Sequence, residues 1–190
     1  LIPRPDTEVI VEQTLKLTKN KSRLKILDIG VGSGCILFSI LKERKSYRGT
    51  GIDICKKTLD ICMINAKKLY LIDRVRLFKS DIDNFSYGKY DLIVSNPPYI
   101  KKFDLKYLEK DVYDYEPKSA LDGGLDGLFK ITKVIYNSSK LIKKNGILIL
   151  EIAFNQTDKV NKILRKNGYY IKDVIKDLAN NNRCIVSIKK

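Results

Sequence analysis

The sequence predicts an α/β fold built on a mostly parallel sheet that helices cover on both faces. Short apolar runs typical of strands alternate with stretches whose apolar residues recur at helical spacing. A glycine-rich loop lies between the first apolar run and the helix that follows it. Two further apolar runs near the end of the chain predict a closing antiparallel hairpin.

The first predicted helix begins at Asp6 or Thr7, either of which can cap it, and runs to about Lys19. Residues 24–29 form a short apolar run suited to a central strand, and the glycine loop follows. The helix after the loop has four apolar residues on one face: Ile36, Leu37, Ile40 and Leu41.

Residues 47–54 predict the second strand, with Asp53 near its end, and residues 74–78 predict the third, with Asp81 shortly after it. The helix between these strands is expected to direct four residues toward the core: Leu59, Met63, Ala66 and Leu69.

Residues 90–95 predict the fourth strand, and residues 100–127 form the longest irregular stretch, of a length that is usually functional. A helix over residues 128–143 is expected to stop near Asn145 and Gly146. The remaining predicted strands, with one helix between the first two, cover residues 146–151, 169–175 and 184–188.

A length of 190 residues predicts one domain, residues 1–190, that can bury a substantial core. No run approaches the roughly 18 apolar residues that cross a membrane, and no signal-peptide pattern is present, so we expect a cytoplasmic protein. The four cysteines form no C-x-x-C pair and histidine is absent, so we expect no metal site and no Ser-His or Cys-His nucleophile. Free, mostly buried thiols fit a reducing compartment.

The net charge of +15 has two explanations. A basic chain can bind nucleic acid, so proximity to RNA or the ribosome stays open. However, lysine supplies most of the basic residues, and Ile, Asn and Tyr are also abundant. All four have A/T-rich codons, so genome composition also explains the charge. The lysines are scattered, so we expect that nucleic acid is not required. Separately, we expect a monomer, although no residue pattern fixes the oligomeric state.

The glycine loop indicates a cofactor site. It follows Asp28 and comprises Gly30, Val31, Gly32, Ser33 and Gly34, where glycines let the backbone turn sharply and approach a ligand. Asp53 ends the next strand, where a carboxylate can accept the ribose hydroxyls of an adenosine. Asp81 is placed to approach the adenine end or, as an equal alternative, to cap the loop or helix that follows it. Because the spacing is G-x-G-x-G, S-adenosylmethionine fits this loop better than NAD.

The tetrapeptide Asn96-Pro97-Pro98-Tyr99 directly follows the fourth predicted strand. The carboxyl edge of an open α/β sheet is where such folds bind ligands. An Asn side chain and a proline-rigidified turn can hold a planar NH2 group, with an aromatic ring packed on its face. The motif therefore indicates chemistry on an amide or on an exocyclic amine.

On these motifs the chain resembles the HemK/PrmC-type protein-(glutamine-N5) methyltransferases. The resemblance is carried by residues 1–8, 26–34, 91–100 and 115–127. It implies a Rossmann-like class I methyltransferase fold with seven strands, dependent on S-adenosylmethionine and releasing S-adenosylhomocysteine. It also implies that the acceptor is the glutamine of the Gly-Gly-Gln motif in peptide chain release factors, the expected partners.

Matched by motif position, Asn96 is expected to bind the glutamine amide with the Pro97 carbonyl, and Tyr99 to pack beside that amide. Glu116 and Arg4 are expected near the acceptor pocket. The expected acceptor-binding and catalytic residues are Asn96, Pro97, Pro98 and Tyr99, with Glu116 and Arg4 at the acceptor. The expected cofactor-binding residues are Asp28, Gly30, Val31, Gly32, Ser33, Gly34, Asp53, Ile54, Asp81, Ile82 and Asn96.

Two departures from the family pattern stand out. Members usually carry a helical N-terminal module that helps to dock the release factor, and no segment of this chain matches it. Some members place an aromatic residue near adenine where this chain has Ile82, which changes how the adenine packs.

Two other functions compete with this prediction. A nucleic-acid methyltransferase acting on adenine or guanine amines would use the same turn and would draw on the basic charge, because it must capture a base and bind phosphates. A non-catalytic module could keep the cofactor fold without the reaction. The loops that match the family oppose the first, and the complete set of expected site residues opposes the second.

Overall fold

The computed structural model describes residues 5–104, 106 and 121–190. Among these residues seven strands form a single sheet. In chain order the strands are β1 (Lys25–Ile29), β2 (Arg48–Asp53), β3 (Val75–Lys79), β4 (Tyr90–Ser95), β5 (Ile142–Glu151), β6 (Tyr169–Lys176) and β7 (Asn182–Lys189).

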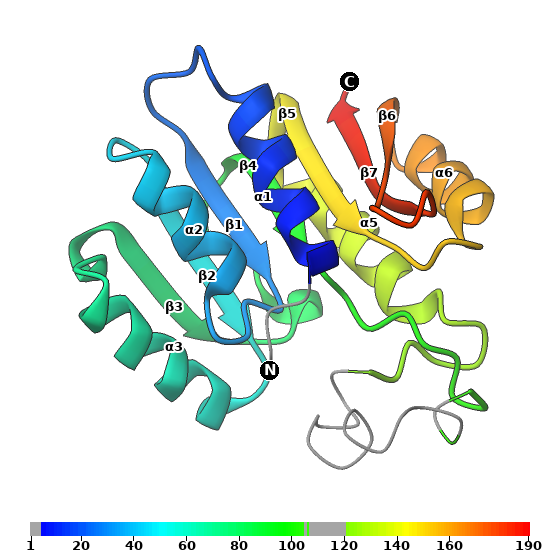
Figure 1. Ribbon diagram of the computed structural model, residues 1–190, viewed down its shortest axis with the longest axis horizontal. Coiled ribbons are helices and arrows are strands. Elements are labelled where there is room, and N and C mark those ends of the chain that lie inside the picture. Colours follow the sequence, from blue (N-terminus) through cyan, green and yellow to red (C-terminus); the bar gives the residue numbers. More distant parts are fainter. Residues whose placement is uncertain (1–4, 105, 107–120) are drawn as a thin grey trace.

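The strands lie in the order β3-β2-β1-β4-β5-β7-β6 (Figure 1). The first five pair in parallel, while β7 runs antiparallel to both β5 and β6. The strand order reverses between β1 and β4, which is the point where open α/β sheets bind ligands. The predicted fold class is therefore confirmed, including the seven strands and the closing antiparallel hairpin.

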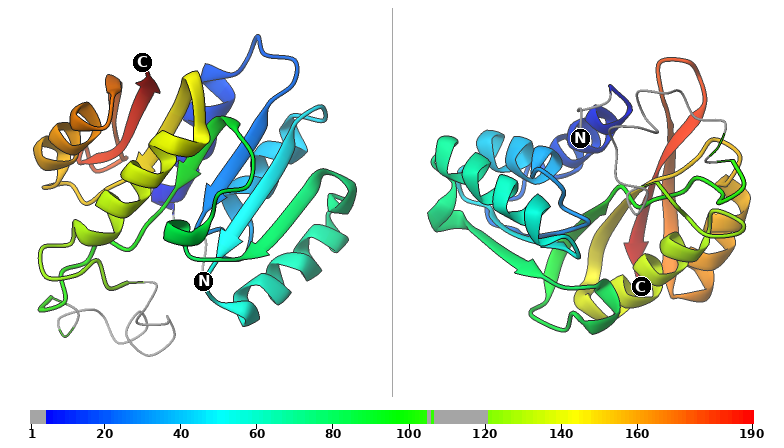
Figure 2. Two further views of the ribbon diagram at one scale, coloured as in Figure 1. Left: turned by 180° about the vertical axis from the view of Figure 1, so that it is seen from behind. Right: turned by 90° about the horizontal axis from the view of Figure 1, so that it is seen from below.

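Helices cover both faces of the sheet. Their bounds are α1 (Pro5–Leu17), α2 (Cys35–Glu43), α3 (Lys56–Lys68), α5 (Phe129–Leu141) and α6 (Thr157–Lys166), with 3-10 turns η1 (Ile72–Arg74) and η2 (Ile82–Asn84). The two views of Figure 2 place α1, α2 and α3 on one face and α5 and α6 on the other. In the chain, α2, α3, α5 and α6 each lie between two strands, and α1 leads into β1.

Each face of the sheet has its own apolar core. On β1, Ile26 belongs to the core beneath α1 and α2, whereas Leu27 and Ile29 belong to the core beneath α5 and α6. This alternation follows from the period of two along a strand, and it explains why the central strands are apolar on both sides. Burial on both faces leaves the carboxyl edge as the place where polar groups can gather.

The boundary between α5 and β5 differs from the prediction. The predicted helix extended to residue 143 and the strand began at residue 146, but α5 ends at Leu141 and β5 begins at Ile142. Asn145 adopts a left-handed φ of 61°, and the pairing register with β4 shifts between Tyr90 and Leu92. Asn145 and Gly146 thus form an irregularity within a strand, as in a β-bulge, and do not terminate the helix.

Two predictions about burial were also wrong. The side chain of Met63 is 40% exposed, because α3 buries only the narrow stripe formed by Leu59, Cys62 and Ala66. The cysteines were expected to be mostly buried, but only Cys62 and Cys184 are, while Cys35 is exposed and Cys55 is intermediate. Within the described ranges, no helix has the length and apolarity that crossing a membrane requires.

Tyr47 provides a test of how the chain leading into β1 is attached to the core. Its side chain is fully buried, and its hydroxyl donates to the carbonyls of Thr18 and Lys21, each at 3.0 Å. We predict that Tyr47→Phe lowers the free energy of unfolding by about 0.5–1.5 kcal/mol, because the hydrogen bonds from this hydroxyl to the two main-chain carbonyls are lost. Urea denaturation would measure the change. Tyr70→Phe, at a 93% exposed position, is the matched control and should change stability little; equal effects would contradict the account.

Candidate functional site

The carboxyl ends of the central parallel strands meet at one edge of the sheet. Ile29 at the end of β1 is in register with Ile52 of β2 and with Ser95 of β4. The glycine loop after β1, Asp53 at the end of β2 and Asn96 after β4 therefore emerge side by side. The structure brings together the predicted site residues of three separate motifs at the topological switch point.

The glycine loop needs its glycines for conformational and steric reasons. Gly30, Gly32 and Gly34 have φ values of 75°, 57° and 90°, in the left-handed region that favours glycine. At Gly34 an added Cβ would lie 2.1 Å from the ring of Phe38, so the loop packs tightly against α2 there. At Gly30 an added Cβ would meet no atom within 4 Å. The space in front of Gly30 is therefore open for a ligand to approach the backbone.

Asp53 fixes this loop to the end of β2. Its Oδ2 accepts a hydrogen bond from the Gly32 N–H at 3.1 Å, and its Oδ1 accepts one from the Cys55 N–H at 2.9 Å. The N–H groups of Gly30 and Val31 both donate to the Ile52 carbonyl at 2.9 Å. Each carboxylate oxygen of Asp53 retains acceptor capacity, so the group can still receive hydroxyl donors from a ligand.

Asp28 is the most unusual charged group at this edge. Its side chain is 1% exposed, and neither carboxylate oxygen has a hydrogen-bond partner. Burial raises the pKa of Asp28 from its ordinary value of 3.8 to about 7; the nearby Leu37 N–H opposes this rise, and the charge of Asp53 adds to it. A buried carboxyl group without a hydrogen-bond partner is costly to ionise, so its shifted pKa marks Asp28 as a candidate functional group.

The turn after β3 adds the third carboxyl group. The Oδ1 of Asp81 accepts a hydrogen bond from the Asp83 N–H at 3.2 Å, which caps η2. Ile82 is 7% exposed and packs into the core beneath α5, whereas Ile54, which follows β2, is 50% exposed. An exposed apolar side chain beside polar acceptors can pack against a ligand ring, so Ile54 stays a predicted cofactor-binding residue.

The turn that contains Asn96 and Pro97 is held from both sides. Ser95 donates from its hydroxyl to the Ile29 carbonyl at 2.7 Å, which joins the end of β4 to the end of β1. The Tyr99 hydroxyl is 3.1 Å from Oε1 of Glu151, a residue that is 1% exposed. The Tyr99 ring packs against the core beneath α5. The turn therefore presents its groups from a rigid frame.

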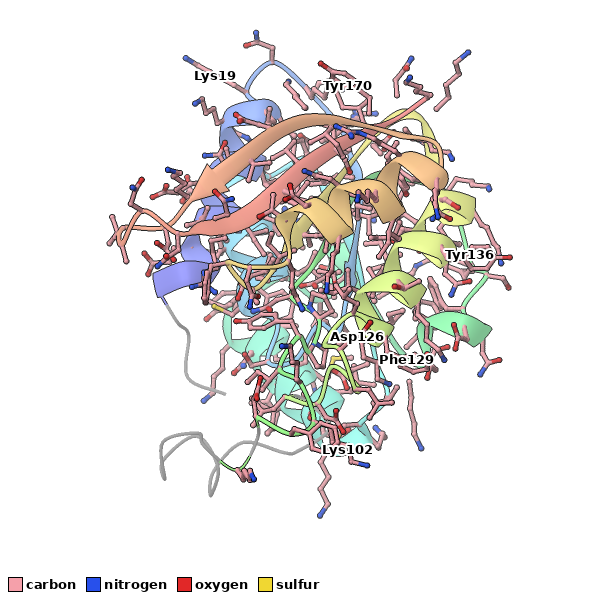
Figure 3. All side chains as sticks on the ribbon, turned by 90° about the vertical axis from the view of Figure 1, so that its right-hand side faces the viewer. Lys19, Lys102, Asp126, Phe129, Tyr136 and Tyr170 are labelled. Atoms are coloured by element: carbon pink, nitrogen blue, oxygen red, sulfur yellow. The ribbon has the colours of Figure 1, made fainter. Side chains whose placement is uncertain are left out.

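Gln156 connects this turn to the segment before α5. Its Nε2 donates to the carbonyls of Gly127 at 3.0 Å and Tyr99 at 3.3 Å, and its Oε1 accepts from the Ala153 N–H. The residues after Tyr99 also pair with this segment, since the Lys102 N–H donates to the Gly124 carbonyl. Figure 3 shows Lys102, Asp126 and Phe129 together at this end of the molecule.

Three supporting residues were not predicted from the sequence. Glu151 and Gln156 hold the turn after β4, and Asn65 of α3 donates from Nδ2 to the Ser33 carbonyl of the glycine loop at 3.0 Å. The position of Glu151 at the end of an apolar strand was a signal that could have identified it. Arg4 and Glu116, both predicted near the acceptor, lie outside the described residues.

The described residues contain no group of three or more His, Cys, Asp and Glu side chains that could hold a metal ion. Cys35 is the first residue of α2, directly after the glycine loop. Although the residue is exposed, the surrounding protein partly desolvates its thiol; this partial burial and then the charge of Asp28 raise the pKa of Cys35, which keeps the thiol protonated. A protonated thiol is a weak nucleophile, so the arrangement favours polar binding groups over a covalent cysteine.

The buried carboxyl of Asp28 predicts a pH-dependent stability. Because its pKa is raised in the folded state, the folded protein binds a proton that the unfolded chain has lost between about pH 4 and pH 7. We predict that the unfolding free energy of the ligand-free protein falls across this window, by at most about 1.4 kcal/mol per pH unit from this group. Asp28→Asn should flatten the fall in urea denaturation, and the exposed Asp104→Asn should not. An unchanged profile for Asp28→Asn would contradict the assignment.

Comparison with known proteins agrees with this geometry. A family described as "Methyltransferase domain" matches residues 20–187. The release factor glutamine methyltransferase of Fusobacterium nucleatum is 40% identical over 195 residues, covering 100% of this chain and 54% of that protein. The proteins of the same name from Caulobacter vibrioides and Clostridium acetobutylicum are 37% and 36% identical, again over 100% of this chain, and are covered to 66% and 67%. The chain thus spans about half to two thirds of the length of these relatives.

Solved structures share the fold at low sequence identity. A ribosomal protein L11 methylase from Lactobacillus delbrueckii superimposes with a TM-score of 0.72 at 18% identity, over 100% of this chain and 80% of that one. A magnesium protoporphyrin IX methyltransferase from Synechocystis, solved with bound SAM, gives 0.67 at 17% identity, over 98% and 80%. The sheet order, the switch-point site and these similarities lead to one conclusion: the chain belongs to the methyltransferase family, and its sequence relatives include release factor glutamine methyltransferases.

Proposed function

We propose that this chain is the catalytic domain of an S-adenosylmethionine-dependent enzyme that methylates the side-chain amide nitrogen of glutamine in the Gly-Gly-Gln motif of peptide chain release factors. The observation that supports this most is the fixed turn at Asn96, set at the switch point directly beside the glycine loop. The relatives at 36–40% identity bear the name of this activity. The whole protein's substrates and partners belong to the same proposal.

The residues at the sheet edge fit S-adenosylmethionine. The open space at Gly30 admits a ligand close to the backbone, and Asp28, buried at the end of β1, would favour a cationic ligand group nearby through its negative charge. The carboxylate of Asp53, already oriented by two backbone N–H groups, can accept ribose hydroxyls. Asp81 would meet the adenine, the main chain at Ile82 would lie beside it because the Ile82 side chain is in the core, and Ile54 would cover one side of the ring. Bound there, S-adenosylmethionine supplies a methyl group on a positively charged sulfur.

The turn after β4 would prepare the acceptor. An amide nitrogen is a poor nucleophile, because its lone pair is delocalised into the carbonyl group. The side-chain oxygen of Asn96 and the carbonyl oxygen of Pro97 would each accept one N–H of the substrate amide. Holding both hydrogens orients the nitrogen and stabilises the positive charge that develops on it. Orientation of this kind can contribute up to roughly 7–11 kcal/mol to lowering the barrier.

The neighbours of the turn give this role its rigidity. Tyr99 would pack beside the substrate amide, and its hydroxyl is already held by Glu151. Gln156 bonds the Tyr99 carbonyl, so the chain on the far side of the turn is also fixed. Preorganised acceptors cost little reorganisation during the reaction, which is where electrostatic stabilisation is most effective. Pro98 restricts the backbone between Pro97 and Tyr99.

A methyl-transfer assay tests the proposed function. Labelled S-adenosylmethionine is offered with a purified release factor, and in parallel with the same factor whose Gly-Gly-Gln glutamine is replaced. The full-length enzyme is the suitable catalyst, since this chain spans only part of its relatives. Label on the first acceptor alone supports the proposal. Label on neither, with cofactor binding intact, would contradict it and direct the search to RNA and DNA acceptors, the nucleic-acid alternative.

Asn96 provides the sharpest single substitution. We predict that Asn96→Ala lowers turnover by about 100- to 1000-fold, the magnitude typical of removing one preorganised group that acts in the transition state. Binding of S-adenosylmethionine should change little, because Asn96 mainly addresses the acceptor. Turnover with labelled cofactor and calorimetric cofactor binding measure the two effects.

The matched control for this substitution is Asn181→Ala, an exposed asparagine in the turn between β6 and β7. It should leave both turnover and cofactor binding at the wild-type level. Wild-type turnover in Asn96→Ala would show that the residue does not hold the acceptor.

A further inference from the structure

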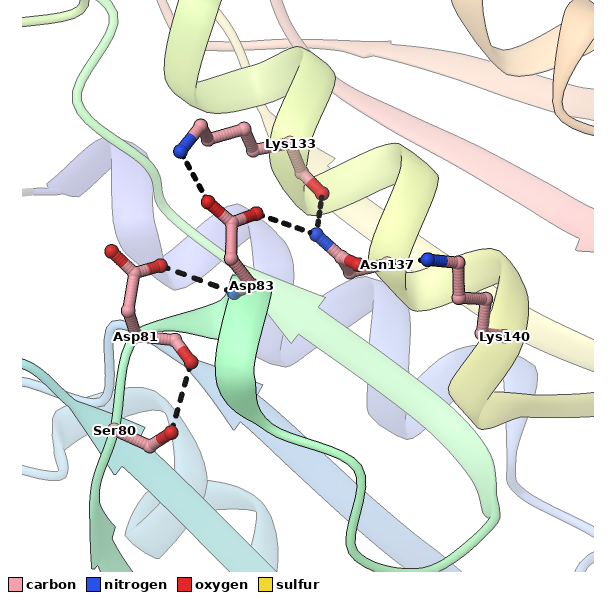
Figure 4. Close-up of polar contacts among 6 residues, drawn as sticks. All are labelled: Ser80, Asp81, Asp83, Lys133, Asn137 and Lys140. Carbon is pink, nitrogen blue, oxygen red and sulfur yellow. Dashed lines mark hydrogen bonds and ion pairs between the residues drawn. The ribbon is translucent and has the colours of Figure 1, made fainter.

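A polar cluster on the face of α5 lies beside the turn that follows β3. It joins Asp81 and Asp83 of that turn to Lys133 and Asn137 of the helix (Figure 4). We propose that Asn137 and Lys133 are positioning residues: they hold Asp83, and through it set the carboxylate of Asp81 for recognition of the adenine amine. This inference rests on the proposed placement of adenine beside Asp81.

Hydrogen bonds within the turn restrain the carboxylate and the backbone of Asp81. The Asp83 N–H donates to Oδ1 of Asp81 at 3.2 Å, so the position of Asp83 restrains the carboxylate of Asp81. The Ser80 hydroxyl donates to the Asp81 carbonyl at 2.9 Å and fixes the backbone on the other side. Figure 4 shows the second oxygen of Asp81 directed away from the turn. That oxygen is the one available to accept a hydrogen bond from an exocyclic amine.

Asn137 attaches Asp83 to α5. Asn137 is 7% exposed, and its Nδ2 donates both to Oδ1 of Asp83 at 2.9 Å and to the Lys133 carbonyl at 3.1 Å. Its Oδ1 accepts from Nζ of Lys140 at 3.4 Å. The amide is therefore oriented by three partners, with its donor directed at Asp83. A buried amide that reaches out of a helix to one carboxylate is a specific tether between the two elements.

Lys133 completes the tether and balances its charge. Its ammonium group forms an ion pair with Oδ2 of Asp83, so both oxygens of that carboxylate are held from α5. The hydrogen bond from Lys133 lowers the pKa of Asp83, and Asp83 in turn raises the pKa of Lys133, with a further contribution from Asp81. Lys133 thus offsets the repulsion between two carboxylates that share one short turn.

Apolar packing connects the same two elements. Ile82, between the two aspartates, belongs to the core cluster that includes Ile131, Val134 and Ile135 of α5. This packing fixes the depth of the turn, and Asn137 and Lys133 fix its rotation by holding Asp83. A change in the tether should therefore alter the direction of the Asp81 carboxylate without detaching the turn.

The test compares two ligands that differ at one position of the purine. S-adenosylhomocysteine carries the exocyclic amine, and S-inosylhomocysteine carries a carbonyl oxygen in its place. Calorimetric titration of wild type and of Asn137→Asp measures both dissociation constants. This substitution keeps the size of the side chain but replaces the donor with an acceptor that repels Asp83.

We expect Asn137→Asp to raise the dissociation constant for S-adenosylhomocysteine at least tenfold and that for S-inosylhomocysteine less than twofold. The double variant Asp83→Asn, Asn137→Asp exchanges donor and acceptor and should restore most of the discrimination. Lys133→Met should act in the same direction, and it is at the surface, so it tests the tether if the buried substitution unfolds the chain. Asn167→Ala removes the hydrogen bond from the Asn167 side-chain amide to the Ile163 carbonyl at the end of α6, and it is the matched control for a general loss of stability.

Two results would overturn the inference. One is an unchanged discrimination in Asn137→Asp and Lys133→Met; the other is an equal weakening of both ligands, which a merely structural role would produce. Asp81→Ala separates this failure from failure of the underlying placement. If Asp81→Ala abolishes the discrimination while the tether variants keep it, only the positioning role is wrong. If Asp81→Ala keeps it as well, adenine does not lie at Asp81 and both claims fall.

Discussion

One carboxylate, that of Asp53, holds together the segments from which the site is built. Its two oxygens accept the N–H groups of Gly32 in the glycine loop and of Cys55 before α3. The glycines of this loop adopt a left-handed backbone conformation that few other residue types tolerate. Because glycine is also flexible, the loop needs such an anchor to keep one conformation. Because the same carboxylate is only partly buried and keeps acceptor capacity, the group that shapes the loop can also bind a ligand. Structure and recognition depend on the same charge.

The acceptor side of the site is supported by a separate set of contacts. Ser95 ties β4 to β1, while Glu151 and Gln156 hold Tyr99 from the neighbouring strand and the loop that follows it. These residues belong to elements on the other side of the switch point from Asp53. The sheet thus brings two independently braced halves to one edge, one suited to an adenosine-containing cofactor and one to a planar amide. Methyl transfer requires both to be in place at once, which a rigid parallel sheet provides.

The sequence was sufficient to predict most of this architecture. Apolar runs and glycine spacing located every strand, and the motifs at Gly30, Asp53 and Asn96 were placed at one edge because parallel strands end there. What the sequence could not show was long-range pairing. Gln156 and Asn137 carry no local signal, since their roles depend on which backbone lies opposite them in the fold. The irregularity at Asn145 was read as a helix end because an Asn-Gly pair fits both a helix stop and a strand bulge.

The measurement that tests the account most directly is calorimetric titration of the chain with S-adenosylhomocysteine, for wild type and for Asp53→Ala. We expect one binding site in wild type and an affinity at least tenfold weaker in Asp53→Ala. The control Asp60→Ala, at an exposed position on α3, should bind with wild-type affinity. Equal affinity in wild type and Asp53→Ala would contradict it, because neither the loop nor the ribose would then depend on the carboxylate that organises this edge.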